Sequence, residues 1–131
     1  MQESRTPIDW KAVGKRSRTK GNVFERTVAN VLKRIWPDAK RSFGQSRKGD
    51  ETPDVVGTPF WIETTASASP NLMAKLAQAE KARRESPGEY AQRPIIVFAN
   101  HQGKTKRVVL MLESEFMDVL TRAYGKQQSD V

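Results

Sequence analysis

The chain contains no cysteine and only one histidine among its 131 residues. The absence of cysteine excludes disulfides, cysteine-ligated zinc sites and thiol nucleophiles, and it is typical of a cytoplasmic protein. No apolar run approaches the roughly 18 residues that a membrane-spanning helix requires. The polar, basic N-terminus also lacks the hydrophobic region of a secretory signal. We therefore expect a cytoplasmic protein without a membrane segment, and we expect the histidine, His101, to be a surface residue in a polar turn rather than a ligand.

Acidic residues are also scarce, since 15 Asp and Glu stand against 23 Lys and Arg, for a net charge of +8. In a small domain, such an excess is typical of binding to nucleic acid or to an acidic surface, although solubility alone is the alternative explanation. The basic residues gather in two clusters, at 11–20 and 40–48. This clustering favours nucleic acid as the partner.

The length suits one compact domain and is hardly enough for two. Residues 1–19 lack hydrophobic periodicity and are expected to form a flexible basic arm, followed by a single domain at 20–125 and a frayed tail at 126–131. The predicted elements are a helix at 21–35, a short strand at 39–43, strands at 54–56 and 60–65, a helix at 71–84 capped by Ser69 before Pro70, strands at 94–100 and 107–112, and a helix at 113–124. This order predicts an α/β fold with a central mixed sheet flanked by helices.

Two acidic residues occupy unusual places in the predicted strands. Asp54 follows a proline at the head of a short apolar run, and Glu63 follows Phe60, Trp61 and Ile62 in another. If the tight turn between these runs makes a hairpin, both carboxylates reach one end of the sheet, where they repel each other unless a cation is present. Mg²⁺ or Mn²⁺ suits such oxygen ligands and can activate water at a phosphate. The alternatives are a turn residue at Asp54 and an exposed edge-strand position at Glu63.

The stretches "KGNVFERTVANVLKR" and "PDVVGTPFWIE" resemble the PD-(D/E)xK nuclease superfamily and, within it, the Holliday-junction resolvases of archaeal and phage type. The similarity covers roughly residues 19–78, and its helix motif K-G-x-x-x-E-R matches at Lys20, Gly21, Glu25 and Arg26. A basic loop with serines, an aspartate after proline and a strand glutamate follow in the same order as in that family.

The resemblance implies a restriction-endonuclease-like core, a homodimer with two metal-dependent sites, and cleavage of branched DNA during recombination and repair. It implies that Asp54 and Glu63 bind Mg²⁺ or Mn²⁺, and that Glu25 binds the ion directly or through water. From the pattern alone, Glu25 is equally well a solvated helix acid beside the apolar stripe.

The sequence departs from the family at Thr65, where the motif E-x-K places a lysine. That lysine orients the attacking water or stabilises the charged transition state, which a threonine hydroxyl cannot do with a positive charge. Three explanations stay open. Lys75 on the following helix projects into the site; the site works with metal alone or with help from Ser46 or Lys48; or cleavage has been lost or weakened, as the bland tract "TTASAS" suggests.

The sequence therefore predicts a metal-dependent endonuclease for branched DNA. The alternatives are a non-catalytic DNA-binding protein of the same fold, a nuclease for flaps, nicks or linear duplex, and an RNA-binding protein. The expected catalytic residues are Glu25, Asp54, Glu63, Thr65 and Lys75, with Gln78 either supporting the site or solvated. The expected DNA-binding residues are Lys15, Arg16, Arg18, Lys20, Arg41, Ser42, Gln45, Ser46, Arg47 and Lys48. Candidates for the dimer surface are Trp10, Trp36 and Phe116.

Overall fold

A computed structural model describes residues 9–42, 52–67, 71–86, 88–101 and 106–125, without the side chains of 10, 12–19 and 101. The elements along the chain are α1 (Trp10–Leu32), β1 (Lys40–Arg41), β2 (Val55–Val56), β3 (Trp61–Thr65), α2 (Leu72–Glu85), the 3₁₀ helix η1 (Gly88–Gln92), β4 (Ile95–His101), β5 (Lys106–Leu110) and α3 (Glu113–Tyr124). The predicted α/β class with a mixed sheet is confirmed.

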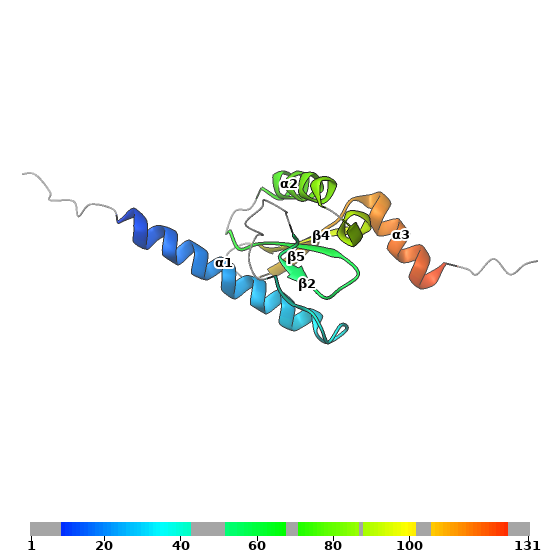
Figure 1. The fold of residues 1–131 in the computed structure, drawn as a ribbon, viewed down its shortest axis with the longest axis horizontal. Coiled ribbons are helices and arrows are strands. Elements are labelled where there is room, and N and C mark those ends of the chain that lie inside the picture. Colours follow the sequence, from blue (N-terminus) through cyan, green and yellow to red (C-terminus); the bar gives the residue numbers. More distant parts are fainter. Residues whose placement is uncertain (1–8, 43–51, 68–70, 87, 102–105, 126–131) are drawn as a thin grey trace, which may run out of the picture.

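The sheet has five strands in the order β1-β2-β3-β4-β5, with β3 in the middle. Strands β3 and β4 are parallel and are connected through α2, whereas the other neighbouring pairs are antiparallel. Helices α1 and α2 lie on opposite sides of the sheet (Figure 1). The buried cluster on the α1 side comprises Phe24, Val28, Ala29, Leu32, Ala39, Val55 and Ile62, and the cluster on the α2 side comprises Trp61, Leu76, Ala79, Ala82, Ile95 and Val97.

Helix α1 begins at Trp10, so the predicted boundary between an arm at 1–19 and a domain at 20–125 is not a break in secondary structure. Lysine, arginine and alanine are good helix formers, and no proline interrupts the chain between residues 8 and 36. The apolar stripe predicts only the part of the helix that packs on the sheet, and among the described side chains that part begins at Phe24. The helix also ends at Leu32, earlier than predicted, and Ile35 is 66% exposed instead of lying in the core.

The predicted turn between the second and third strands is present, and Gly57 makes it possible. Its φ of 86° lies in the left-handed region, and a Cβ atom at this position would lie 2.3 Å from the backbone oxygen of Asp38. The Thr58 hydroxyl accepts a hydrogen bond from the Phe60 amide at 3.1 Å. The turn therefore reverses the chain tightly and fixes the antiparallel pairing of β2 with β3.

The remaining elements agree closely with the predictions, apart from the start of α2 and the loop before β4. The N-cap of α2 is Asn71, whose side chain accepts from the Ala74 amide at 3.0 Å, and not Ser69, which lies outside the described residues. Asparagine and serine are equally favourable N-cap residues, so residue type alone does not show which of the two caps the helix. The predicted loop before β4 contains η1.

Candidate metal and phosphate site

Asp54 and Glu63 meet at one end of the β2–β3 pair. The register joins Val55 to Ile62, so the next step along the antiparallel pair places Asp54 opposite Glu63. Only 8% of Glu63 is exposed, whereas Asp54 is half-buried at the end of the sheet. The alternative of an exposed edge-strand position for Glu63 is therefore wrong, because β3 is the middle strand and α2 covers this face.

Glu63 is a buried carboxyl with two different neighbours. Its Oε1 accepts a hydrogen bond from the indole Nε1 of Trp61 at 2.8 Å, and its Oε2 lies 3.6 Å from the Nζ of Lys75. Burial, and next the charge of Asp54, raise the pKa of Glu63 to about 8, against the opposing influence of Trp61 and Lys75. Without a bound cation, Glu63 therefore keeps its proton at neutral pH.

Asp54 is fixed by the strand that it faces. Its Oδ2 accepts from both the amide and the hydroxyl of Thr64, at 2.8 and 3.1 Å. The other carboxylate oxygen, Oδ1, is not used in these two bonds. The two bonds from Thr64 thus hold the Asp54 side chain in one orientation beside Glu63.

Glu25 comes from α1 and lies at the rim of the core, as the pattern predicted. Its Oε2 forms an ion pair with the Nε of Arg41 at 3.0 Å, and Nη2 of Arg41 donates to Asn22. Burial, followed by the charge of Asp54, raises the pKa of Glu25, and Arg41 opposes this shift. Asp54 is the acid whose charge acts on both glutamates, and it lines the same hollow as Glu25.

The three acids do not form a complete set of metal ligands in this conformation. Within the part of the chain that the structure describes, no group of three acidic, histidine or cysteine side chains is arranged to hold an ion. The donor chemistry nevertheless suits a hard divalent cation, because Asp54 and Glu63 present carboxylate oxygens that repel each other when both are ionised. Glu25 is engaged by Arg41 and must release it, or act through water, to take part.

Lys75 is the cation that the structure places at the Glu63 carboxylate. Thr65, which occupies the family's lysine position, is two residues after Glu63 on β3 and is half-buried. Because α2 covers the face of β3 that holds Glu63, a lysine in its first turns reaches the same carboxylate from the other element. The Gln78 side chain is exposed and forms no hydrogen bond within the described residues, as expected of a solvated helix side chain.

A hollow of about 220 Å³ opens beside Asp54. Ser42 and Thr52 both line it, and their hydroxyls are hydrogen-bonded at 3.1 Å. The residues that flank 43–51 are therefore held together at this hollow. The lining residues are Asn22, Glu25, Arg41, Ser42, Thr52, Pro53 and Asp54. The hollow therefore brings together a guanidinium, two hydroxyls and the carboxylates of Glu25 and Asp54.

The predicted DNA-binding residues are only partly described. Lys20 is exposed on α1, and Arg41 and Ser42 lie at the hollow. Lys15, Arg16 and Arg18 lie on α1, but their side chains are outside the described part, as are Gln45, Ser46, Arg47 and Lys48. The explanation that Ser46 or Lys48 assists the site therefore also falls outside the described residues.

Sequence reasoning missed three contacts at this site. The Trp61–Glu63 hydrogen bond joins residues two apart on a strand, which share a face. The pattern W-x-E could therefore have revealed this bond. The bonds from Thr64 to Asp54 could be predicted only with the register of the hairpin. The Arg41–Glu25 pair joins a helix to a strand, and no periodicity relates the two positions.

Comparisons with other proteins add no family to this picture. No protein-family model matches the chain, and no match was found among curated protein sequences or among solved structures. None of the helices in the described ranges is long and apolar enough to cross a membrane.

Proposed function

We propose that the protein is a metal-dependent endonuclease that hydrolyses phosphodiester bonds in branched DNA. The observation that supports this most directly is the meeting of Asp54 and Glu63 at the sheet end, with Lys75 at Glu63. Burial, and next the charge of Asp54, raise the pKa of Glu63, and a carboxyl perturbed in this way is typical of functional sites. The proposal includes a restriction-endonuclease-like core, and the mixed sheet with helices on both faces supports it.

Asp54 and Glu63 would hold Mg²⁺ or Mn²⁺, with Glu25 binding directly or through water. When bound, the ion supplies charge neutralisation at the phosphate and lowers the pKa of its water. Thr64 keeps Asp54 in place through two hydrogen bonds, and Trp61 fixes the orientation of Glu63. These contacts hold the ligands in advance, so little reorganisation is needed at the moment of reaction.

Lys75 takes the role of the lysine that Thr65 replaces. Its ammonium lies 3.6 Å from Glu63, close enough to orient a water or to stabilise negative charge on the phosphate. The Thr65 hydroxyl can donate a hydrogen bond but carries no charge. This arrangement favours the first of the three explanations for the missing motif lysine.

The experiment is to incubate the purified protein with a labelled four-way junction and Mg²⁺, beside flap, nicked and linear duplex DNA. We expect cleavage of the branched substrate that Asp54→Asn abolishes. Asp118→Asn, an exposed site on α3, is the matched control and should cleave normally. Tight binding without products in the wild-type protein would contradict the enzyme proposal and would support a DNA-binding protein of the same fold.

The weakened-activity alternative has one observation in its favour. Arg41 neutralises Glu25 in the described conformation and leaves the third acid occupied. If Glu25 never releases Arg41, catalysis depends on two carboxylates alone. Arg41→Gln would then raise the cleavage rate, whereas an Arg41 that contacts the phosphate would make the same change lower it.

We also propose that the protein acts as a homodimer. Apolar side chains are exposed on β5 and on α3, with Val109 58%, Phe116 46% and Met117 50% exposed. Trp36, another predicted candidate, instead packs edge-on against Phe60 with ring centroids 5.6 Å apart, and the Trp10 side chain is not described. Light scattering of the wild-type protein and of Phe116→Glu tests the proposal, which requires a dimer that the substitution dissociates.

A further inference from the structure

A second hollow, of about 230 Å³, lies between α1 and β1 outside the acidic site. Arg26, Ala29 and Asn30 line it from one face of α1, and Lys33 lines it from the turn that directly follows the helix. Lys40 and Arg41 line it from β1. The small side chain of Ala29, only 2% exposed, belongs to the buried core and leaves room between the longer neighbours.

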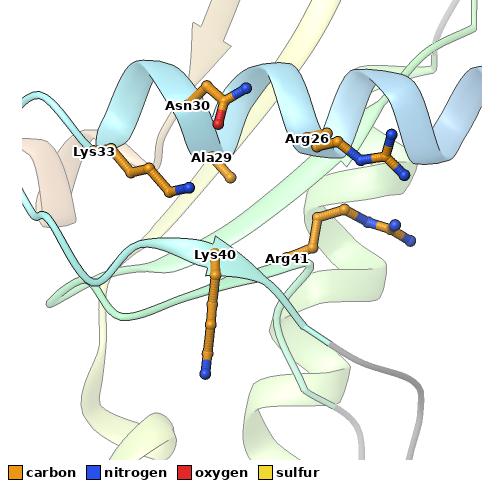
Figure 2. A pocket seen from close by; sticks show the side chains of 6 residues that line it. All are labelled: Arg26, Ala29, Asn30, Lys33, Lys40 and Arg41. Atoms are coloured by element: carbon orange, nitrogen blue, oxygen red, sulfur yellow. The ribbon is translucent and has the colours of Figure 1, made fainter.

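The lining of this hollow is positive and contains no acid. Figure 2 shows Arg26 extending from α1 and Arg41 from β1, with their guanidinium groups at the same end. Lys33 extends from the end of the helix at the opposite end, and Lys40 points away from α1. Within the described ranges, no ion pair involves Arg26, Lys33 or Lys40. Positive groups gathered around one hollow raise the local potential, which favours an anion between them.

The size and position of the hollow narrow the choice of anion. Its volume is below the roughly 300–1,000 Å³ of pockets that hold drug-sized ligands, so it suits a single charged group. Arg41 lines both this hollow and the one beside Asp54, so the two hollows are neighbours. A polymer with regularly spaced phosphates can place one phosphate in each.

We propose that the hollow formed by Arg26, Asn30, Lys33 and Arg41 binds a backbone phosphate of DNA next to the phosphate at the acidic site. Arginine offers several fixed donors to phosphate oxygens, Asn30 adds an amide donor, and Lys33 adds a point charge. Arg41 links the two positions and sets the register of the strand relative to Asp54. The proposal rests on the proposed function only for the identity of the ligand as DNA.

The test measures binding to a labelled four-way junction in EDTA, without divalent metal, between about 50 and 200 mM salt. The variant is Arg26→Gln with Lys33→Gln, which keeps good helix formers at two exposed positions. The matched control is Lys81→Gln with Arg84→Gln, two exposed basic residues on α2, which covers the opposite side of the sheet. Both pairs remove two positive charges, and unchanged thermal unfolding midpoints establish that both fold.

We expect the hollow variant to bind about tenfold more weakly at the lowest salt, as loss of a charge-assisted contact predicts. Its log–log salt slope should be less steep by about 0.9, the value for one phosphate contact. The control should keep the wild-type slope. Equal losses in both variants would show that only net charge matters and would overturn the proposal, as would no loss in either.

Cleavage of the same junction in Mg²⁺ separates this proposal from the nuclease function. If the salt slope of binding differs between wild type and the hollow variant but wild type yields no products, the nuclease proposal is contradicted and the phosphate site is supported. Metal-dependent cleavage combined with a hollow variant that binds like wild type contradicts the phosphate site alone.

Discussion

Replacing Glu63 by glutamine tests whether this carboxyl serves function at the expense of stability or is a structural partner of Lys75. In the folded protein, burial and Asp54 raise the pKa of Glu63 from 4.5 to about 8. Between these two values the folded state binds more protons than the unfolded chain, so the free energy of unfolding falls as the pH rises through this window. The ionised carboxyl thus destabilises the metal-free fold at pH 8 and has little effect at pH 4.5 or below.

The magnitude follows from the same shift. At about 1.4 kcal/mol per pKa unit, the rise from 4.5 to about 8 gives a ceiling of about 5 kcal/mol. Glutamine keeps an oxygen to accept the bond from Trp61 Nε1, but it loses the ion pair with Lys75. We therefore expect Glu63→Gln to stabilise the metal-free protein by about 1–3 kcal/mol at pH 8, with a difference near zero at pH 4.5.

The assay is urea unfolding in EDTA, followed by circular dichroism at both pH values. Glu85→Gln, at an exposed position on α2, is the control and should change stability little at either pH. Adding Mg²⁺ or Mn²⁺ at pH 8 should stabilise the wild-type protein, by about 2.7 kcal/mol at 100 times the dissociation constant, and should stabilise Glu63→Gln much less. A loss of stability in Glu63→Gln at pH 8, or an equal effect at both pH values, would refute this reasoning and make Glu63 a structural partner of Lys75.

Three further predictions concern single positions. Lys75→Met should lower the cleavage rate roughly 100- to 1,000-fold, because it removes the cation at the acidic pair, whereas Lys81→Met, at an exposed position on the same helix, should leave the rate unchanged in a single-turnover assay. Gly57→Ala should destabilise the protein by more than about 1 kcal/mol in urea unfolding, because the φ of Gly57 is 86° and a Cβ atom there would collide with backbone. Gly21→Ala, with open space around it in α1, should instead stabilise the protein by up to about 1 kcal/mol. Glu115→Ala should cost about 1–3 kcal/mol, since its carboxylate accepts from an arginine at 2.7 Å and from a β4 amide at 2.9 Å, and an unchanged midpoint would show that these bonds do not hold α3 in place.

Local patterns were sufficient to predict most of the fold. Helix α3 has the predicted bounds, and the strand pattern located β3, β4 and β5 to within two residues. These elements are set by periodicity and by glycine and proline, which act over a few residues. The extent of α1 was missed because its first turns show no apolar stripe, and only helix propensity marks them.

The candidate site was predicted only in part. The sequence drew attention to Asp54 and Glu63 because an acid in an apolar strand is costly, and the hairpin turn predicted that they would meet. It left Lys75 as one of three explanations for Thr65. The 3.6 Å contact with Glu63 depends on how α2 crosses the face of β3, which no spacing along the chain specifies.

By itself, the sequence determined the α/β class, the excess of positive charge and the tight turn at Gly57, because each depends on composition or on neighbouring residues. Only the tertiary structure decided that Arg41 pairs with Glu25 and that two hollows share this arginine. These relations join residues that are distant along the chain, and their distances are fixed by packing on the two faces of the sheet.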